Sequence, residues 1–418
     1  MTAQPASADS WSRTFYWGVA TAGFQSEGTA PDSNWSRYVA RTSGVDPYGN
    51  AVDFRHRYAE DIRLARQMGV TTFRFSVEWA RVEPRPGVWD ETELAYYDDV
   101  VAHIRDAGMT PMITLSHWVY PGWVADQGGF AAPKTVDDFV AFAGAVVRRY
   151  HGLGVLWVTF NEPVAFLTEE LRIGALDPLQ IPQWQSDVVQ AHRRVYDLVH
   201  ASDPAAKVTS NQAFYSGFNP LTDLVIMDRI KDKVDFVGLD YYYGLSLDNL
   251  TAVNGISGDT WKIKLQPEGI YYALRYYAAR YPGLPLYVVE NGMPTDNGKP
   301  RDDGYTREAA LRDSIFWLQR AKADGMNVIG YNYWSITDNY EWGSYRPRFG
   351  LYTVDALTDP SLTRRPTGGV AAYRQVTGDG GVPSGYRLVQ APADCSLVDF
   401  PSSCLTPANP NGPLAPLN

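Results

Sequence analysis

The chain of 418 residues contains little of what protein metal and redox centres are built from. It has two cysteines and six histidines, and no C-x-x-C, H-x-H or H-E-x-x-H arrangement occurs in it. Zinc ribbons, thioredoxin-type centres and zinc hydrolases depend on those spacings, so these classes are excluded. We therefore expect no catalytic metal and no cofactor.

Basic clusters and long apolar runs are also missing. The chain carries 37 basic and 47 acidic side chains, a formal net charge of −10, and no dense run of Lys or Arg. Nucleic-acid binding needs such clusters to neutralise phosphates, and a membrane span needs about 20 consecutive apolar residues. We expect neither a nucleic-acid partner nor a membrane span, and the composition does not predict an oligomeric state.

The two cysteines allow two interpretations. Cys395 and Cys404 lie nine positions apart in a tail rich in Pro and Ser, which suits either a small surface disulfide or two free thiols. A disulfide favours an oxidising compartment, whereas the first residues, MTAQPASADSW, have neither the basic start nor the apolar stretch of a signal peptide. We therefore expect a secreted protein whose signal peptide is absent from this chain, and we favour this location slightly over the cytoplasm.

Short runs of β-branched and aromatic residues between turn residues predict eight strands. They are Phe15–Ala22, Thr71–Val77, Pro111–His117, Val155–Asn161, Lys207–Phe214, Val234–Tyr242, Pro285–Glu290 and Val328–Ser335. Segments of helical period separate most of them. Eight strand-then-helix units with buried strands predict an α/β fold, a single (β/α)8 TIM barrel. A doubly wound sheet is less suitable because the G-x-G-x-x-G fingerprint is absent.

The pattern also predicts domain and helix boundaries. We expect residues 1–376 to form the catalytic barrel and residues 377–418, rich in Gly, Pro and Ser, to form an irregular tail that is packed on the barrel or disordered. One helix is predicted from a capping box at Thr135–Asp138 up to Tyr150. Another is predicted over Tyr58–Met68, with Gly69 as its stop signal.

Two glutamates stand where predicted strands end. Glu162 follows the fourth strand, and Glu290 ends the seventh. In a barrel of this kind the C-terminal strand ends surround the active site. A carboxylate is costly to bury there unless it is paired or used. We expect either a salt-bridged arrangement or the two carboxylates that glycosidic bond cleavage requires.

A set of segments in a fixed order resembles the family 1 glycoside hydrolases, which include β-glucosidases and β-galactosidases. Each segment is a weak match, but the ordered set from about residue 15 to residue 355 is specific. The segments are Phe15–Thr21 with Gln25, Phe73–Ser76, Leu115–Trp118, Thr159–Pro163, Glu290–Gly292, Tyr333–Ser335, Asp338–Trp342 and Arg348–Gly350.

The resemblance implies a retaining double displacement with Glu162 as general acid/base and Glu290 as nucleophile. It further implies that Arg74 and Tyr242 support the charge of Glu290. Without the resemblance, Arg74 would be interpreted as a structural ion-pair partner and Tyr242 as a packed aromatic residue.

The resemblance also implies a set of sugar-binding residues. Asn161 would contact the sugar 2-hydroxyl, and Trp334 would stack under the ring. A carboxylate at Glu341 would repel a 6-phosphate, so an unphosphorylated glycoside is favoured. Without the resemblance, His117 would be interpreted as a core histidine. The full set is Gln25, His117, Trp118, Asn161, Tyr242, Trp334, Glu341 and Trp342.

Several positions depart from the family pattern. Asp240 stands where the family usually has Asn, and Val289 stands where it usually has Thr. The stretch Glu169–Trp184 does not resemble the usual loop. Because loops after the strands form the leaving-group side of the cleft, the natural aglycone is not predicted.

We therefore expect an O-glycoside hydrolase, a retaining exo-acting β-glycosidase. Its partner would be a small-molecule or oligosaccharide β-glycoside, from which it removes the non-reducing terminal sugar. β-D-Glucosides are the expected substrates, with β-galactosides or β-fucosides as further ones. Two alternatives remain: a transglycosylase that uses the same glutamate pair, and a catalytically silent sugar-binding protein.

Overall fold

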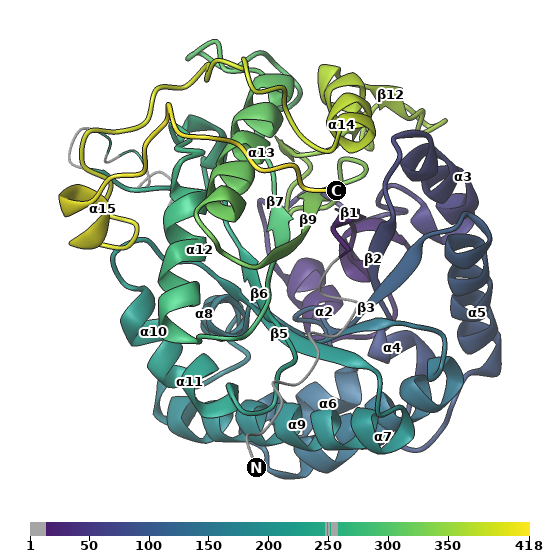
Figure 1. Ribbon diagram of the computed structural model, residues 1–418. Coiled ribbons are helices and arrows are strands. Elements are labelled where there is room, and N and C mark those ends of the chain that lie inside the picture. Colours follow the sequence, from purple (N-terminus) through teal and green to yellow (C-terminus); the bar gives the residue numbers. More distant parts are fainter. Residues whose placement is uncertain (1–13, 247–248, 250, 252–257) are drawn as a thin grey trace, which may run out of the picture.

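A closed barrel of eight parallel strands forms the centre of the molecule (Figure 1). The computed structural model describes residues 14–246, 249, 251 and 258–418. The barrel order is β1-β2-β3-β4-β5-β6-β7-β9, and every neighbouring pair is parallel. The strands are β1 (Tyr16–Ala20), β2 (Thr72–Ser76), β3 (Thr110–Ser116), β4 (Leu156–Asn161), β5 (Lys207–Ala213), β6 (Val237–Asp240), β7 (Leu286–Asn291) and β9 (Val328–Trp334). The predicted (β/α)8 barrel is confirmed, with each strand inside its expected range or one residue beyond it.

Helices surround the barrel, and each barrel strand is followed by at least one of them (Figure 1). The outer ring consists of α3 (Phe54–Gln67), α5 (Glu91–Asp106), α7 (Lys134–Tyr150), α9 (Ile181–Ser202), α10 (Asn219–Val225), α11 (Met227–Ile230), α12 (Gly269–Arg280), α13 (Arg307–Ala323) and α14 (Gly368–Asp379). Across the described ranges, no helix combines the length and apolar character that crossing a bilayer requires.

Short elements occupy the connecting loops. The remaining α-helices are α1 (Gly23–Ser26), α2 (Asn34–Arg41), α4 (Trp79–Val82), α6 (Gly122–Asp126), α8 (Pro163–Arg172) and α15 (Ser402–Leu405). Two small antiparallel pairs join β8 (Thr295–Asp296) to β10 (Pro347–Arg348) and β11 (Tyr352–Thr353) to β12 (Arg365–Pro366).

The predicted helix boundaries are confirmed at the C-terminal ends and are wrong at the N-terminal ends. Helix α7 begins at Lys134, so Thr135 already lies inside it, and its hydroxyl donates to the Gly129 carbonyl oxygen at 2.6 Å. The predicted capping box is therefore wrong, because Thr135 lies inside the helix and its hydroxyl donates to the preceding turn. Helix α3 begins at Phe54, four residues before the predicted start, and Gly69 ends it in the left-handed region at φ 77°.

Apolar side chains fill the space on both sides of the barrel wall. Outward-facing residues such as Trp157 and Val288 join the large cluster shared with the helices. Alternate strand residues point to opposite faces, and the inward-facing ones form a separate cluster. That cluster contains Met112, Leu156, Val158, Phe236, Tyr287, Val289 and Ile329. The lower half of the barrel is therefore a packed core, and polar side chains are left for its C-terminal mouth.

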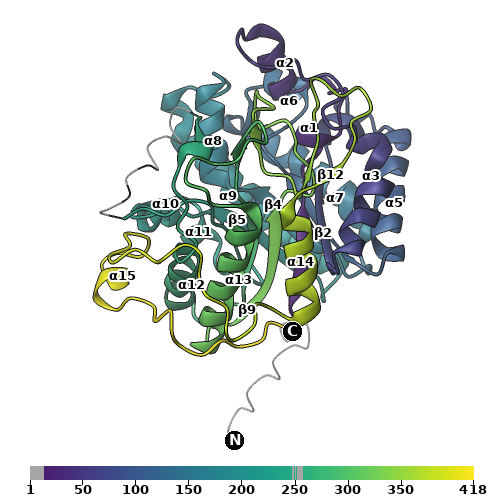
Figure 2. The ribbon, with the colours of Figure 1, turned by 90° about the horizontal axis from the view of Figure 1, so that it is seen from above.

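The C-terminal residues after α14 run over helices α12 and α13, as the yellow trace in Figures 1 and 2 shows. Asp399 forms an ion pair with Arg275 of α12 at 2.8 Å, and the Asn409 carbonyl oxygen accepts from Arg320 of α13 at 3.1 Å. The last residue, Asn418, accepts from the indole nitrogen of Trp17 in β1 at 2.6 Å. These contacts hold the tail on the barrel.

Cys395 and Cys404 are joined in a disulfide. The loop that it closes adjoins the segment after β6, because the Leu397 amide donates to the Leu245 carbonyl oxygen at 2.7 Å. The sequence allowed either a disulfide or two free thiols, and the structure shows the disulfide.

This disulfide closes a short loop, so its removal should have a moderate effect. We expect the double variant Cys395→Ser/Cys404→Ser to lose about 2–3 kcal/mol of unfolding free energy, since the open chain gains conformational entropy when unfolded. Urea denaturation would measure the loss. The reduced wild-type protein should unfold like the double variant, and equal stability of oxidised wild type and double variant would contradict the prediction.

Candidate active site

Irregularities in the ends of the strands turn polar side chains into the mouth of the barrel. The register of β4 against β5 shifts between Val158 and Asn161, and the register of β7 against β9 shifts between Val288 and Asn291. Strict alternation after the inward-facing Val289 would point Glu290 out of the barrel. An extra residue in a strand reverses that alternation, and Glu290 instead contacts Arg74 inside the mouth.

An open cleft of about 910 Å³ lies over this mouth. Both predicted catalytic glutamates and all eight predicted sugar-binding residues line it, from the ends of six strands and the loops after them. They are Glu162, Glu290, Gln25, His117, Trp118, Asn161, Tyr242, Trp334, Glu341 and Trp342. Arg74 lies beneath them and is completely buried. The structure thus brings together every predicted site residue.

Glu290 is held by two donors. The Arg74 guanidinium forms a buried ion pair with one of its oxygens, and the Tyr242 hydroxyl donates to the other at 2.7 Å. Arg74 also donates to the Asn161 side-chain oxygen at 2.7 Å and to the Thr114 hydroxyl at 3.0 Å. Because both donors favour the ionised carboxylate, this environment keeps Glu290 negatively charged.

The surroundings of Glu162 are different. No cation forms an ion pair with it in the part of the chain that the structure describes. Burial raises the pKa of Glu162 to about 8, and the negative charge of Glu290 contributes to the rise. A hydrogen bond with Asp240 and the charge of Arg74 oppose it. The surroundings of Glu162 therefore favour its protonated form, whereas those of Glu290 supply two hydrogen-bond donors.

Three cleft residues adopt left-handed backbone conformations that non-glycine residues seldom use. They are Trp118 at φ 69°, Glu162 at φ 41° and Trp342 at φ 48°. Such conformations cost about 1–3 kcal/mol each and are found where function requires a particular side-chain direction. Their occurrence at three cleft positions marks this mouth as the functional site.

A second hydrogen-bonded group forms another part of the cleft wall. Glu341 accepts from the Trp334 indole nitrogen at 3.0 Å and from the Gln25 amide at 3.2 Å. Burial raises the pKa of Glu341 to about 7. The Gln25 side-chain oxygen is buried, and no described donor binds it, so it is available to a ligand.

Aromatic rings stack along the same wall. The rings of Trp118 and Trp342 are stacked with their centroids 4.6 Å apart, and His117 stacks on Trp334 at 5.8 Å. Burial and the positive charge of Arg74 lower the pKa of His117 well below its usual value, so this side chain is neutral. Its Nδ1 atom has no hydrogen-bond partner among the described residues. The wall offers apolar faces and free polar atoms together, as a sugar ring requires.

Two polar residues of the mouth were missed as site residues by sequence reasoning. Asn211 at the end of β5 donates to the side chains of Asn161, at 2.7 Å, and Asp240. Asp240 ends β6, where it lies in register with Glu290 of β7. The unusual Asp in place of Asn was a visible signal, but it predicted no contact.

Glu162, Asp240 and Glu290 form a group of three carboxylates. One oxygen of each lies within 4.8 Å of the others. Oxygen ligands of this kind suit hard divalent cations, but the Arg74 guanidinium already brings a positive charge into the group. The expectation that the protein uses no metal stays a prediction.

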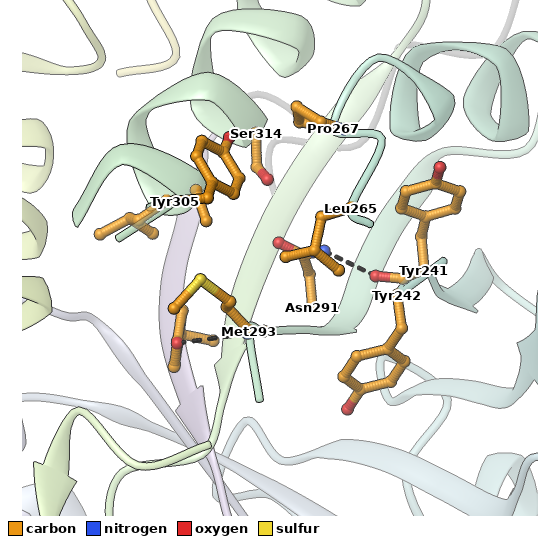
Figure 3. Close-up of a pocket in the computed structure, with 12 residues that line it drawn as sticks. Tyr241, Tyr242, Leu265, Pro267, Asn291, Met293, Tyr305 and Ser314 are labelled. Carbon is orange, nitrogen blue, oxygen red and sulfur yellow. Dashed lines mark hydrogen bonds between the residues drawn. The ribbon is translucent and has the colours of Figure 1, made fainter. Parts of the chain in front are cut away.

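Asn291 points away from the cleft into a small internal hollow behind β6 and β7 (Figure 3). Its side chain donates to the Tyr241 carbonyl oxygen at 2.6 Å and accepts from the Tyr331 hydroxyl at 2.8 Å. The hollow has a volume of about 10 Å³, enough for one water molecule.

The next residue, Gly292, has no room for a side chain, because a Cβ atom there would lie 2.1 Å from the Trp334 carbonyl oxygen. Asn291 and Gly292 therefore fix the end of the Glu290 strand.

The arrangement can perform acid–base and nucleophilic chemistry on one bound molecule. An ionised carboxylate and a protonated carboxyl face each other across the mouth, each held in its state by its surroundings. Pairs of carboxyl groups with unequal proton affinity are typical of enzymes that use one group as acid and the other as nucleophile or base.

Known proteins resemble this chain over most of its length. The family model described as glycosyl hydrolase family 1 matches residues 7–217 and 210–381. Galactolipid galactosyltransferase SFR2 of Arabidopsis thaliana is 30% identical over 80% of the chain, which spans only 60% of that relative. Beta-glucosidase A of Thermotoga maritima is 27% identical over 84% of this chain and 94% of its own.

A solved structure agrees in fold. The structure of a beta-glucosidase named 1317 superimposes with a TM-score of 0.75 at 28% identity, over 88% of this chain and 99% of that one. With its (β/α)8 barrel, two unequal carboxyl groups at the C-terminal mouth and a family model that matches most of its length, the chain belongs to glycosyl hydrolase family 1.

Proposed function

We propose that this protein is a retaining, exo-acting β-glycosidase that acts through Glu290 as nucleophile and Glu162 as general acid/base. The observation that carries the proposal is the unequal environment of the two carboxyl groups in one cleft. Arg74 and Tyr242 hold Glu290 ionised, whereas burial raises the pKa of Glu162 to about 8. A nucleophile must be ionised and an acid must carry its proton at the same pH.

The spacing of the two groups supports retention of configuration. One oxygen of Glu162 lies within 4.8 Å of one oxygen of Glu290. Retaining glycosidases place their carboxyl groups about 5–5.5 Å apart, whereas inverting ones need about 6.5–9.5 Å to admit a water molecule. A pair of oxygens this close is compatible with the retaining arrangement, in which Glu290 attacks the sugar directly.

The proposed reaction takes two steps. In the first, a Glu290 oxygen forms a bond to the anomeric carbon while the bond to the glycosidic oxygen breaks, and Glu162 gives its proton to the departing oxygen. In the second, Glu162 takes a proton from water, whose oxygen attacks the anomeric carbon and releases Glu290 as a carboxylate. Protonation of the leaving group by a positioned acid contributes about 10²–10⁴-fold.

The cleft supports a terminal sugar with a further group attached. The free polar atoms of Gln25 and His117, together with Glu341, would bind the hydroxyls of the sugar. A volume of about 910 Å³ is near the upper end for small-molecule sites, about 300–1,000 Å³, and leaves room for an aglycone. We propose β-D-glucosides as substrates, in keeping with the relative named beta-glucosidase A, with β-galactosides or β-fucosides as further substrates.

Removing the proposed nucleophile gives the first test. Glu290→Ala should lower kcat on p-nitrophenyl β-glycosides by at least about 10⁴-fold, because the covalent step is lost. Added azide should restore turnover, and its product should be the α-glycosyl azide. Assays of the wild-type protein on the p-nitrophenyl β-glucoside, β-galactoside, β-fucoside and β-glucoside 6-phosphate would rank these sugars by rate of hydrolysis. A β-glycosyl azide would show that the nucleophile is assigned to the wrong residue.

Removing the proposed acid gives a test that depends on the leaving group. Glu162→Ala should hydrolyse poorly leaving alkyl glycosides about 10²–10⁴-fold more slowly. Its first step on a dinitrophenyl glycoside should be nearly as fast as in the wild type, because that group leaves without protonation. Single-turnover kinetics would separate the first step from the second. An equal loss on both classes of substrate would contradict the acid role.

Transglycosylation is the second candidate. The named galactosyltransferase of Arabidopsis is 30% identical, and the large cleft could accept a second sugar-bearing molecule in place of water. In that case, addition of an alkyl glycoside acceptor to a p-nitrophenyl glycoside should yield disaccharide products in excess over free sugar. Chromatography of the products would decide, and free sugar as the main product would favour the hydrolase.

A further inference from the structure

Asp240 is a third carboxyl group at the catalytic pair, although it does not line the cleft. It ends β6, is 1% exposed and lies in register with Glu290. One of its oxygens accepts from the Asn211 amide. The other oxygen, Oδ1, is buried and meets no donor in the described chain, but the Asp240 carboxyl is within hydrogen-bonding reach of Glu162.

The charges around Asp240 are unbalanced. Within the described part of the chain, it faces the carboxyl groups of Glu162 and Glu290 and the cation Arg74. Arg74 donates to Glu290, Asn161 and Thr114, and no hydrogen bond from it to Asp240 occurs within the described ranges. The Tyr242 hydroxyl also points to Glu290 rather than to Asp240, and Glu341, farther along the wall, adds negative charge.

Three adjacent carboxylates cannot all be ionised beside one arginine, because like charges at this distance strongly disfavour each other. Glu290 has the two donors and remains the carboxylate. Burial, followed by the charges of Glu290 and Glu162, raises the pKa of Asp240 well above its usual value. A hydrogen bond between two carboxyl groups requires a proton on one of them, and the crowding of three carboxyl groups within 4.8 Å favours a proton between Asp240 and Glu162.

We propose that Asp240 is a positioning residue that shares one proton with Glu162, so that the two carboxyl groups together keep their last proton to higher pH than a lone glutamic acid would. This inference rests on the proposed function of Glu162. An asparagine at position 240, the usual residue of the family, would offer a permanent donor but no place for the proton. The pair titrates as a unit, and its last proton belongs to both residues.

The charge balance of the first step fits this role. Before it, the pair and Glu290 together carry two negative charges if the pair holds one proton. When Glu162 gives that proton to the glycosidic oxygen, both members of the pair become carboxylates, while Glu290 becomes a neutral ester. The mouth carries two negative charges before and after the step, so the charge that the pair gains is the charge that Glu290 loses.

Asp240→Asn tests the proposal through the pH profile of kcat/KM. The substitution removes a negative charge that opposes loss of the last proton, so Glu162 should lose its proton at lower pH. We expect the alkaline limb of the profile to move down by about one pH unit, with the acid limb unchanged because protonated Asp and Asn are both neutral. If Asp240 had only a structural role, loss of its hydrogen bonds would lower kcat/KM at every pH and leave the alkaline limb in place. An unmoved alkaline limb would overturn the proposal.

Glu78→Gln is the matched control. Glu78 is a buried carboxyl outside the cleft whose pKa is also raised to about 8, by burial, and it accepts from Ser76 at 2.9 Å. Replacing it should leave the alkaline limb in place. Thermal unfolding of both variants would show that the substituted proteins are folded.

An infrared titration gives a second readout that does not need activity. The carbonyl band of protonated carboxyl groups should disappear at lower pH in Asp240→Asn and in Glu162→Gln than in the wild type, since each single variant removes one member of the pair. Loss of activity on every glycoside together with this shift would overturn the proposed function but not the proton-sharing pair. If the carbonyl band disappears at the same alkaline pH in the wild type, Asp240→Asn and Glu162→Gln, the proposal of a shared proton is overturned.

Discussion

The Arg74 guanidinium is the interaction on which the mouth of the barrel depends. It projects from β2 without any exposed surface and joins Thr114 of β3, Asn161 of β4 and Glu290 of β7. A buried charge of this kind is stable only when its donors are paired. The polar ends of four strands are therefore held together around one cation, and the apolar layer below them closes the barrel.

One cation among several carboxyl groups makes those groups unequal. Glu290 takes the ion pair, while burial and the negative charges of neighbouring groups raise the pKa values of Glu162, Glu341 and Asp240. The same cation helps to keep His117 neutral. The unequal surroundings of the two glutamates and the neutral imidazole of His117 thus depend on where the positive charge of Arg74 lies.

Much of this molecule could be predicted from its residues. Strand runs such as Val155–Asn161 are apolar enough to be recognised by composition alone. Gly69 is recognisable as a helix end because glycine readily adopts the left-handed conformation that the structure shows there. The capping-box pattern misplaced the start of α7, because Thr135 lies inside the helix and donates to the Gly129 carbonyl oxygen of the preceding turn. Asp240 was visible as an unusual residue, but its partners Asn211 and Glu162 lie 29 and 78 positions away, and no local pattern links them.

By itself the sequence determined the barrel, the two glutamates at strand ends and the residues that resemble a sugar site, because burial and strand period are local properties of the chain. Only the tertiary structure decided which way the two glutamates face and which charged groups surround each of them. The shifts of register in β4 and β7 reverse the simple alternation of side chains, and Arg74, Glu290 and Asp240 come together from separate strands. Both depend on how strands pair in space, which the order of residues along one strand does not contain.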